Sequence, residues 1–224
     1  MFLGHYGVAF AAKKAAPKTS LGTLVFAAQF ADLLWPILLL FGIEKVRIVP
    51  GLLPGSPFDF VSYPISHSLI AQMGWGALIG VIYYASRRNR GNALLVAGLV
   101  PTHWLLDFIA HRPDMPIYPG GPKYGLGMWN SIPLTIAVEC ALFVAGIAVY
   151  ISVTRAKDWA GHVAFWSLAG LLGFVFASSF SGPPPPSEQA VAWVTMALWL
   201  TVPWAAWADR HRLTAADQPE TTSD

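Results

Sequence analysis

Charged residues are scarce in this chain. Asp, Glu, Lys and Arg make up 12% of its 224 residues, about half of the roughly 25% that soluble proteins carry. Hydrophobic residues make up 55%, and the mean hydropathy is +0.51. This balance excludes an ordinary soluble domain and predicts an all-α, polytopic integral membrane protein whose main partner is the lipid bilayer. The net charge of only +2 gives no reason to expect a nucleic-acid partner.

Cysteine is nearly absent as well. Cys140 is the single cysteine, which excludes an internal disulfide. A cleavable secretory signal is not expected, because Lys13, Lys14 and Lys18 follow the first apolar run instead of preceding it. The apolar segments are therefore expected to serve as membrane helices.

Six apolar runs are long enough to cross a bilayer as helices, which takes about 20 residues. We expect these spans at Leu21–Ile43, Ser66–Ser86, Asn92–His111, Ser131–Val153, His162–Ser179 and Gln189–Ala208. A shorter apolar helix within Met1–Ala16 is expected to enter the bilayer only partway or to lie along its surface. Residues 1–208 then form one transmembrane domain, and the polar stretch 209–224 is expected to be a disordered tail.

Basic residues are unevenly distributed between the two sides of these spans. Ten lie on one side, in the segments that contain Lys13, Arg87, Arg155 and Arg210, and four lie on the other side. The positive-inside rule then predicts a bacterial inner (plasma) membrane protein with both termini in the cytoplasm. The outer connections at 44–65 and 112–130 are rich in Pro and Gly, and we expect ordered covers over the helix ends, with plain connectors as the alternative.

Ionisable side chains within apolar spans are the main clue to function, because each costs about 2.5–3.5 kcal/mol at the bilayer centre. The stretch 102–119 places His103, Asp107 and His111 at steps of four, which puts them on one face of a helix. Two imidazoles and a carboxylate at this spacing can hold a metal or relay a proton. The alternative is a polar seam that joins helices through hydrogen bonds.

Two further residues fall at the same depth if the N-terminal helix folds back on the first span near Lys18. His5 and Asp32 then lie about 20 Å from that turn, and we expect them to pair with each other. The alternatives are an interfacial position for His5 and, for Asp32, a role beside a kink at Pro36.

His67 and Glu139 also fall between mid-membrane and the outer surface. His67 is a candidate ligand, or else an interfacial residue beside a helix cap at Ser66. Glu139 is a candidate for proton transfer, or else pairs with Arg112 or Lys123 at the outer rim. Apart from His5 in the N-terminal helix, the candidate groups thus lie within or at the outer ends of the first four spans, and the last two spans are expected to be scaffold.

Four short motifs resemble a bacterial family of inner-membrane proteins described as metal-dependent hydrolases. The matching residues are Gly4-His5, Asp32 with Pro36, His67-Ser68 at the end of the stretch 62–68, and Thr102-His103 with Asp107 before Pro116–Pro119. Their order and relative spacing agree with the family over 4–119, but Leu34 and Ser62 stand where the family has an Asp and a His. The resemblance implies a metal site formed by His5, Asp32, His67, His103 and Asp107, with His111 and Asp114 as candidate replacements for the missing ligands.

The first hypothesis is therefore an integral-membrane, metal-dependent hydrolase. Mixed imidazole and carboxylate ligands suit Zn²⁺ first, with Mn²⁺ or Fe²⁺ as alternatives, and such a metal activates water. Asp107, His111 and Glu139 are the candidate catalytic proton carriers. A site near the outer leaflet favours a lipid-linked or amphipathic substrate, such as a phosphoester. The other hypotheses are a proton-coupled transporter or permease and a non-catalytic structural membrane protein.

Overall fold

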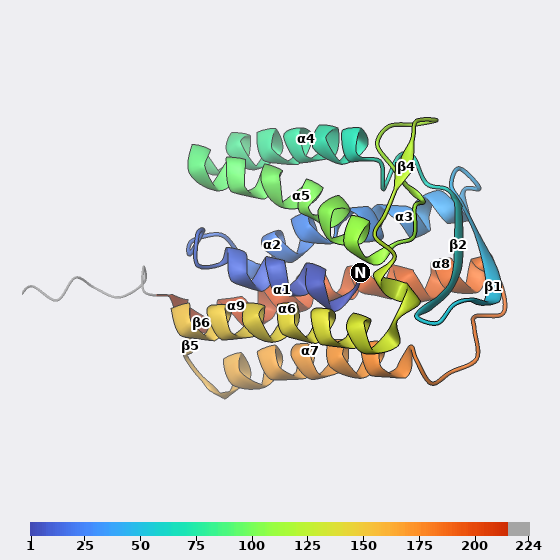
Figure 1. Cartoon of the computed structure of the whole chain (residues 1–224). Coiled ribbons are helices and arrows are strands. Elements are labelled where there is room, and N and C mark those ends of the chain that lie inside the picture. Colours follow the sequence, from blue (N-terminus) through green and yellow to red (C-terminus); the bar gives the residue numbers. More distant parts are fainter. Residues whose placement is uncertain (215–224) are drawn as a thin grey trace, which may run out of the picture.

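A computed structural model describes residues 1–214 of the chain as a mostly helical bundle (Figure 1). The α-helices are α1 (Leu3–Ala12), α2 (Leu21–Ala28), α3 (Phe30–Leu40), α4 (Leu69–Arg87), α5 (Arg90–Ala110), α6 (Ile132–Val153), α7 (Trp159–Ser178), α8 (Glu188–Met196) and α9 (Thr201–Arg210), with 3-10 turns η1 (Met128–Asn130) and η2 (Ala197–Leu200). The described part also holds three antiparallel strand pairs, β1 (Lys45–Leu53) with β2 (Ser56–Ser62), β3 (Met115–Pro116) with β4 (Lys123–Tyr124), and β5 (Thr154–Ala156) with β6 (Arg212–Thr214).

Within residues 1–214, five helical segments are long and apolar enough to cross a membrane: α4, α5, α6, α7 and the continuous run of α8, η2 and α9. The pair α2 and α3 makes a sixth if it counts as one span. These segments match the six expected runs, but the first is not a single helix over Leu21–Ile43. Its two halves are bent by 57°, and the break lies at Gln29, whose φ of −97° and ψ of 4° are not helical. The bend thus lies two turns before Pro36, which the sequence indicates only as the alternative site of a kink, and α3 is continuous through Pro36.

Helix α1 lies inside the bundle, where it packs against α6 and α2. Tyr6, Ala9 and Phe10 are fully buried, so the alternative of a helix along the membrane surface is wrong. A Cβ on Gly7 would lie 2.4 Å from the carbonyl oxygen of Leu142, and one on Gly146 would lie 2.2 Å from that of Gly7. The backbones of α1 and α6 are thus in contact, which only small residues allow.

A cover closes one end of the bundle, at the right of Figure 1. It consists of the β1–β2 hairpin and the loop 112–130. The Gly55 amide donates a hydrogen bond to the Trp129 carbonyl over 2.9 Å, and the Arg112 guanidinium pairs with Asp59 of β2. Phe60 of β2 and Tyr63 belong to one buried apolar cluster at this end of the bundle. The two outer connections are therefore ordered covers, as expected, and the alternative of plain connectors is wrong.

The basic segments, which contain Lys13, Arg87, Arg155 and Arg210, lie together at the end of the bundle opposite the cover. This arrangement is consistent with the expected orientation. The side of the membrane that this end faces stays a prediction. There Lys13 pairs with Asp209 over 2.6 Å, and the hydroxyls of Thr19 and Tyr83 are 2.8 Å apart. Met1 is not at this end, because it lies buried within the bundle. A cytoplasmic position can therefore apply to the segment around Lys13 but not to Met1.

The expected disorder of 209–224 is wrong for its first residues. Asp209 and Arg210 end helix α9, and β6 pairs with β5. Arg212 is buried, with its guanidinium carbon 5.3 Å from the centre of the Tyr150 ring. A cation over an aromatic face is favourable, and this contact fixes the start of the polar stretch. The rest of that stretch, 215–224, lies outside the described residues.

Candidate metal centre

Five side chains meet beneath the cover, on the inner side of the aromatic residues. They are His5 from α1, Asp32 from α3, His67 from the turn before α4, and His103 and Asp107 from α5, and we call them the His/Asp cluster. Two overlapping groups within it, His5 with His103 and Asp107 and Asp32 with His67 and His103, have ligand atoms that all lie within 4.8 Å of one another. Each of these groups can hold a metal ion.

Four atoms of the cluster have the spacing of a metal site. Nε2 of His103 lies 3.2 Å from Oδ2 of Asp107 and 3.7 Å from Oδ1 of Asp32. Nε2 of His67 lies 3.5 Å from Oδ1 of Asp32 and 3.8 Å from Oδ2 of Asp107. Ligands at 2.0–2.2 Å from one centre in a tetrahedron stand about 3.3–3.6 Å apart. Along these four contacts the donors therefore have nearly the spacing that a tetrahedral cation needs.

The break between α2 and α3 orients His103. Nδ1 of His103 lies 2.9 Å from the carbonyl oxygen of Ala28, the last residue of α2. A carbonyl only accepts, so Nδ1 carries the proton and Nε2 keeps its lone pair. That Nε2 is buried and makes no hydrogen bond. A buried ring nitrogen without a donor, directed at two carboxylates and a second imidazole, fits a metal ligand.

His67 is oriented in the same way by a neighbouring hydroxyl. Its Nδ1 lies 2.7 Å from Oγ of Ser66, and that hydroxyl donates to Glu44. Glu44 in turn accepts the amides of Ile65 and Ser66 over 2.8 and 2.9 Å. Since the Ser66 proton is directed to Glu44, its oxygen accepts from Nδ1 of His67, and Nε2 again keeps its lone pair. Outer partners of this kind are typical of metal-ligating histidines.

The sequence did not reveal this support. The pattern around Glu44 predicts no role for it, and for Ser66 it indicates only a helix cap. The cap of α4 is instead Ser68, whose hydroxyl accepts the amide of Ala71 over 3.3 Å. The sequence signal for this support was the serine on each side of the histidine in Ser66-His67-Ser68. It does not tell which of the two hydroxyls holds the imidazole ring.

Asp107 is the centre of the cluster. Its Oδ1 accepts a bond from Nε2 of His5 over 3.1 Å and is also bonded by the α-amino group of Met1. The His5 ring stacks on His103, with ring centres 3.7 Å apart and planes within 3°. The expected direct pair between His5 and Asp32 is wrong, because His5 contacts Asp107 and His103, while Asp32 contacts His67 and His103. Both residues do belong to the same cluster.

Glu139 fixes the start of α1. Its carboxylate accepts the amide of Phe2 over 2.8 Å and that of Gly4 over 2.9 Å. These are amides at a helix N-terminus, which carry no partner within the helix. The alternative in which Glu139 pairs with Arg112 or Lys123 is therefore wrong. By holding α1, Glu139 determines where His5 lies.

His111 stands at the mouth of the cluster, at the C-terminal end of α5. Its Nε2 lies 3.9 Å from Oδ2 of Asp107, and its Nδ1 lies 3.0 Å from Oδ1 of Asp114. Asp114 also accepts from the Tyr63 hydroxyl over 3.1 Å and from Arg112 over 3.3 Å. Burial raises the pKa of Tyr63 well above its usual value, so this hydroxyl keeps its proton and donates. Asp114 thus orients His111 from outside the cluster.

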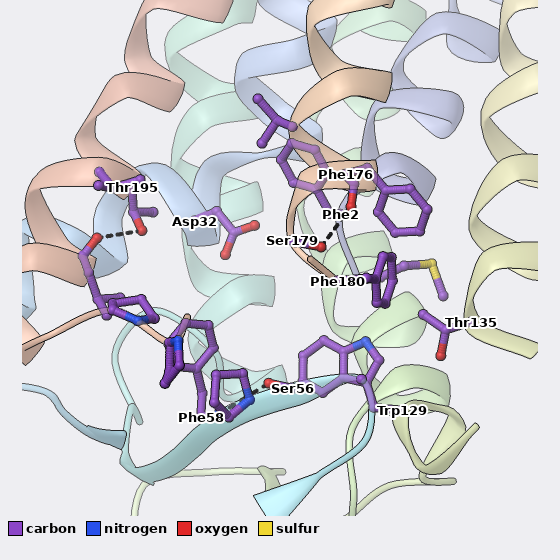
Figure 2. Close-up of a pocket in the computed structure, with 18 of the residues that line it drawn as sticks. Phe2, Asp32, Ser56, Phe58, Trp129, Thr135, Phe176, Ser179, Phe180 and Thr195 are labelled. Carbon is purple, nitrogen blue, oxygen red and sulfur yellow. Dashed lines mark hydrogen bonds between the residues drawn. The ribbon is translucent and has the colours of Figure 1, made fainter. Parts of the chain in front are cut away.

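A cavity of about 820 Å³ opens beside the cluster (Figure 2). Asp32, His67, Asp107, His111 and Glu139 form its polar end, and most of its remaining wall is apolar. The Asp32 side chain is 19% exposed, against 3% for those of His67 and Asp107. The cluster therefore faces the cavity mainly through Asp32.

The arrangement offers a buried set of nitrogen and oxygen donors beside a cavity of ligand size. No protein-family model, curated protein or solved structure matches this chain.

Proposed function

We propose that this chain is an integral-membrane, metal-dependent hydrolase whose metal is held by Asp32, His67, His103 and Asp107. The observation that carries the proposal is the spacing of their four ligand atoms, 3.2–3.8 Å along the four measured contacts. Two imidazole nitrogens and two carboxylate oxygens suit Zn²⁺ first, then Mn²⁺ or Fe²⁺. The resemblance to inner-membrane metal-dependent hydrolases supports the same residues and adds His5.

The residues around this set have separate roles in the proposal. A bound divalent cation would polarise a substrate oxygen and activate water. His111 presents Nε2 to the cavity and is the proton carrier, because Asp114 holds its other nitrogen. Asp107 and His5 hold each other in place at the cluster. Glu139, first considered as a proton carrier, is better described as a positioning residue, since its carboxylate is bonded to two amides of α1.

The substrate in this proposal is amphipathic or lipid-linked, with a phosphoester or a related ester as the group that is cleaved. The polar end of the cavity lies beneath the cover, and the basic segments lie at the opposite end of the bundle. The positive-inside rule places the cover on the outer side of a bacterial inner membrane. The reacting group would then meet the cluster near the outer leaflet.

Elemental analysis of the detergent-purified chain tests this proposal. We expect about one equivalent of a first-row transition metal per chain, and a fall in the unfolding midpoint when a chelator removes it, because a ligand that binds only the folded state stabilises it. Zn²⁺ added back should restore the midpoint. A preparation without stoichiometric metal, whose midpoint does not respond to Zn²⁺, Mn²⁺ or Fe²⁺, would contradict the proposal.

Ser66 and Ser68 provide a matched pair of variants on the two sides of His67. Ser66→Ala removes the partner of Nδ1 and should weaken metal binding by roughly 10- to 100-fold, the usual cost of losing an outer partner. Ser68→Ala removes a helix cap and should cost about 1 kcal/mol of stability with little effect on affinity. Competition with a metal indicator measures the affinity, and thermal unfolding measures the stability. Equal metal affinities of the two variants would show that Ser66 does not support metal binding through His67.

A proton-coupled transporter is the second candidate, and the bent pair α2–α3 favours it. Transporters often build their sites from discontinuous helices, and Asp32 lies just beyond this break. Uptake into vesicles with and without a pH gradient tests this candidate. Uptake that depends on the gradient, in protein without stoichiometric metal, would favour the transporter over the hydrolase. A purely structural cluster predicts neither metal nor uptake, and only lower folding yield when its members are replaced.

A further inference from the structure

We propose that the substrate is a membrane lipid that reaches the His/Asp cluster sideways from the bilayer, between α7 and α8, and keeps its apolar chain between these helices. This inference rests on the proposed function and specifies the substrate class of the same site. It is carried by the position of the cavity, which extends from the cluster to the outer surface of two membrane-spanning segments.

These two segments form one part of the cavity wall, beside the cover and the linker that joins α7 to α8. Helix α7 contributes Leu172 and Phe176, and helix α8 contributes Val191 and Thr195. Figure 2 shows Phe176 and Phe180 facing the cavity, with Asp32 on another part of its wall. Helix α7 packs against α9, whereas α8 packs against α3. Helices α7 and α8 are therefore not each other's main packing partners, and residues from both of them line the cavity.

The lining passes from buried to exposed residues along the same two helices. On α7, Leu172 is 2% exposed, while Val175, one turn further on, is 42% exposed. On α8, Val191 is 4% exposed and Val194 is 74% exposed. All four line the cavity. In a membrane-spanning segment, apolar side chains exposed at this level face acyl chains and not water, so the cavity opens to lipid.

One end of the cavity is polar and the other is apolar, as are the two ends of a lipid molecule. One end carries the carboxylates and imidazoles of the cluster, and the other carries aliphatic and aromatic side chains. No Lys or Arg side chain is among the described residues that line it, and its polar side chains outside the cluster include the hydroxyls of Ser179 and Thr195. A cavity of about 820 Å³ is also near the upper end of the roughly 300–1,000 Å³ of small-molecule sites. These features suit a molecule with one compact polar group and a long apolar chain.

Photo-labelling in vesicles tests this inference. The probe is phosphatidylcholine with a diazirine in its acyl chain, mixed into vesicles that contain the full chain, and labelled residues are identified by mass spectrometry. We expect label on Leu172 and Phe176, which are buried in the cavity wall, as well as on Phe174, which is exposed and does not line the cavity. Label on Phe174 without label on Leu172 and Phe176 would overturn the inference.

Bulky substitutions at the opening provide a second measurement. Val194→Trp should abolish the label on Leu172 and Phe176 and leave that on Phe174 unchanged. Val144→Trp is the matched control, because Val144 is equally apolar, is exposed on α6 and does not line the cavity. Unchanged label on Leu172 and Phe176 in Val194→Trp would contradict access between α7 and α8.

Metal content, measured in the same preparations, separates this inference from the proposed function. Label in the cavity of a chain that binds no metal would support the lipid site and contradict the hydrolase. Stoichiometric metal without label in the cavity would leave the metal site in place and overturn lateral access.

Discussion

Replacing His103 with alanine is expected to abolish stoichiometric metal binding, and Asp107→Asn is expected to do the same. His103 belongs to both groups of donors within 4.8 Å, and Asp107 contacts His5, His67 and His103 through its two oxygens. Both are proposed ligands, so the loss of affinity should exceed the roughly 10- to 100-fold cost of losing an outer partner. Any hydrolytic activity should fall with it.

The choice of variants keeps loss of metal distinct from loss of folding. Both Asp107→Ala and Asp107→Asn remove the counter-charge of the buried Met1 amino group, and breaking a buried ion pair typically costs about 3–5 kcal/mol. Asp107→Asn is preferred because it keeps the size of the side chain and an oxygen that accepts hydrogen bonds. His162→Ala is the matched control, because His162 lies on α7 outside the cluster. Elemental analysis and size-exclusion profiles are compared for the parent chain, the single and double variants and the control. The prediction fails if a folded His103→Ala, Asp107→Asn double variant retains the metal content of the parent chain.

The sequence predicted which residues share the site better than it predicted how they contact one another. The spacing of four puts His103 and Asp107 on one face of a helix, and the rise per residue brings His5 and Asp32 to the same depth. The rise per residue gives the depth of a side chain along the helix axis, but it does not tell toward which neighbouring helix the side chain points. The pairing of His5 with Asp107 instead of Asp32 depends on how α1, α3 and α5 are rotated about their axes, and that is set by packing.

The break at Gln29 shows a different limit. Pro36 is the evident breaker in the first span, yet helix α3 continues through it, and the bend occurs where neither Gly nor Pro stands. The bend is accompanied by a bond from His103 to the Ala28 carbonyl, which is a contact between residues far apart in the chain. The local sequence does not reveal a contact between residues so far apart. The apolar run therefore predicted the span, but not its division into α2 and α3.

The cover was only partly predictable for a related reason. The Pro and Gly residues at 44–65 indicated turns, and ordered covers were expected. The pairing of β1 with β2, and the bond from Arg112 to Asp59 that fastens the hairpin to the loop after α5, depend on long-range partners. Glu44 was missed in the same way, because its function is to support Ser66 and His67 from a position just before the hairpin.

Gly146→Leu, a substitution outside the cluster, is expected to cause a large loss of stability. A Cβ at this position would lie 2.2 Å from the carbonyl oxygen of Gly7 and 2.5 Å from its Cα. These are backbone atoms of a buried helix, so no side-chain rotation can relieve the clash. Overpacking of a well-packed core usually costs about 1–3 kcal/mol, and a clash with backbone should reach at least the upper part of this range.

The damage should also extend to the metal centre, because α1 carries both His5 and the amides that Glu139 holds. We therefore expect Gly146→Leu to lower the unfolding midpoint and to weaken metal binding together. Gly170→Leu is the matched control, since a Cβ on Gly170 of α7 meets nothing within 4 Å. Thermal unfolding in detergent, with and without added Zn²⁺, measures both effects. Equal midpoints for the two variants would mean that α1 and α6 are not packed backbone to backbone, and the placement of His5 beside Asp107 would then lose its structural support.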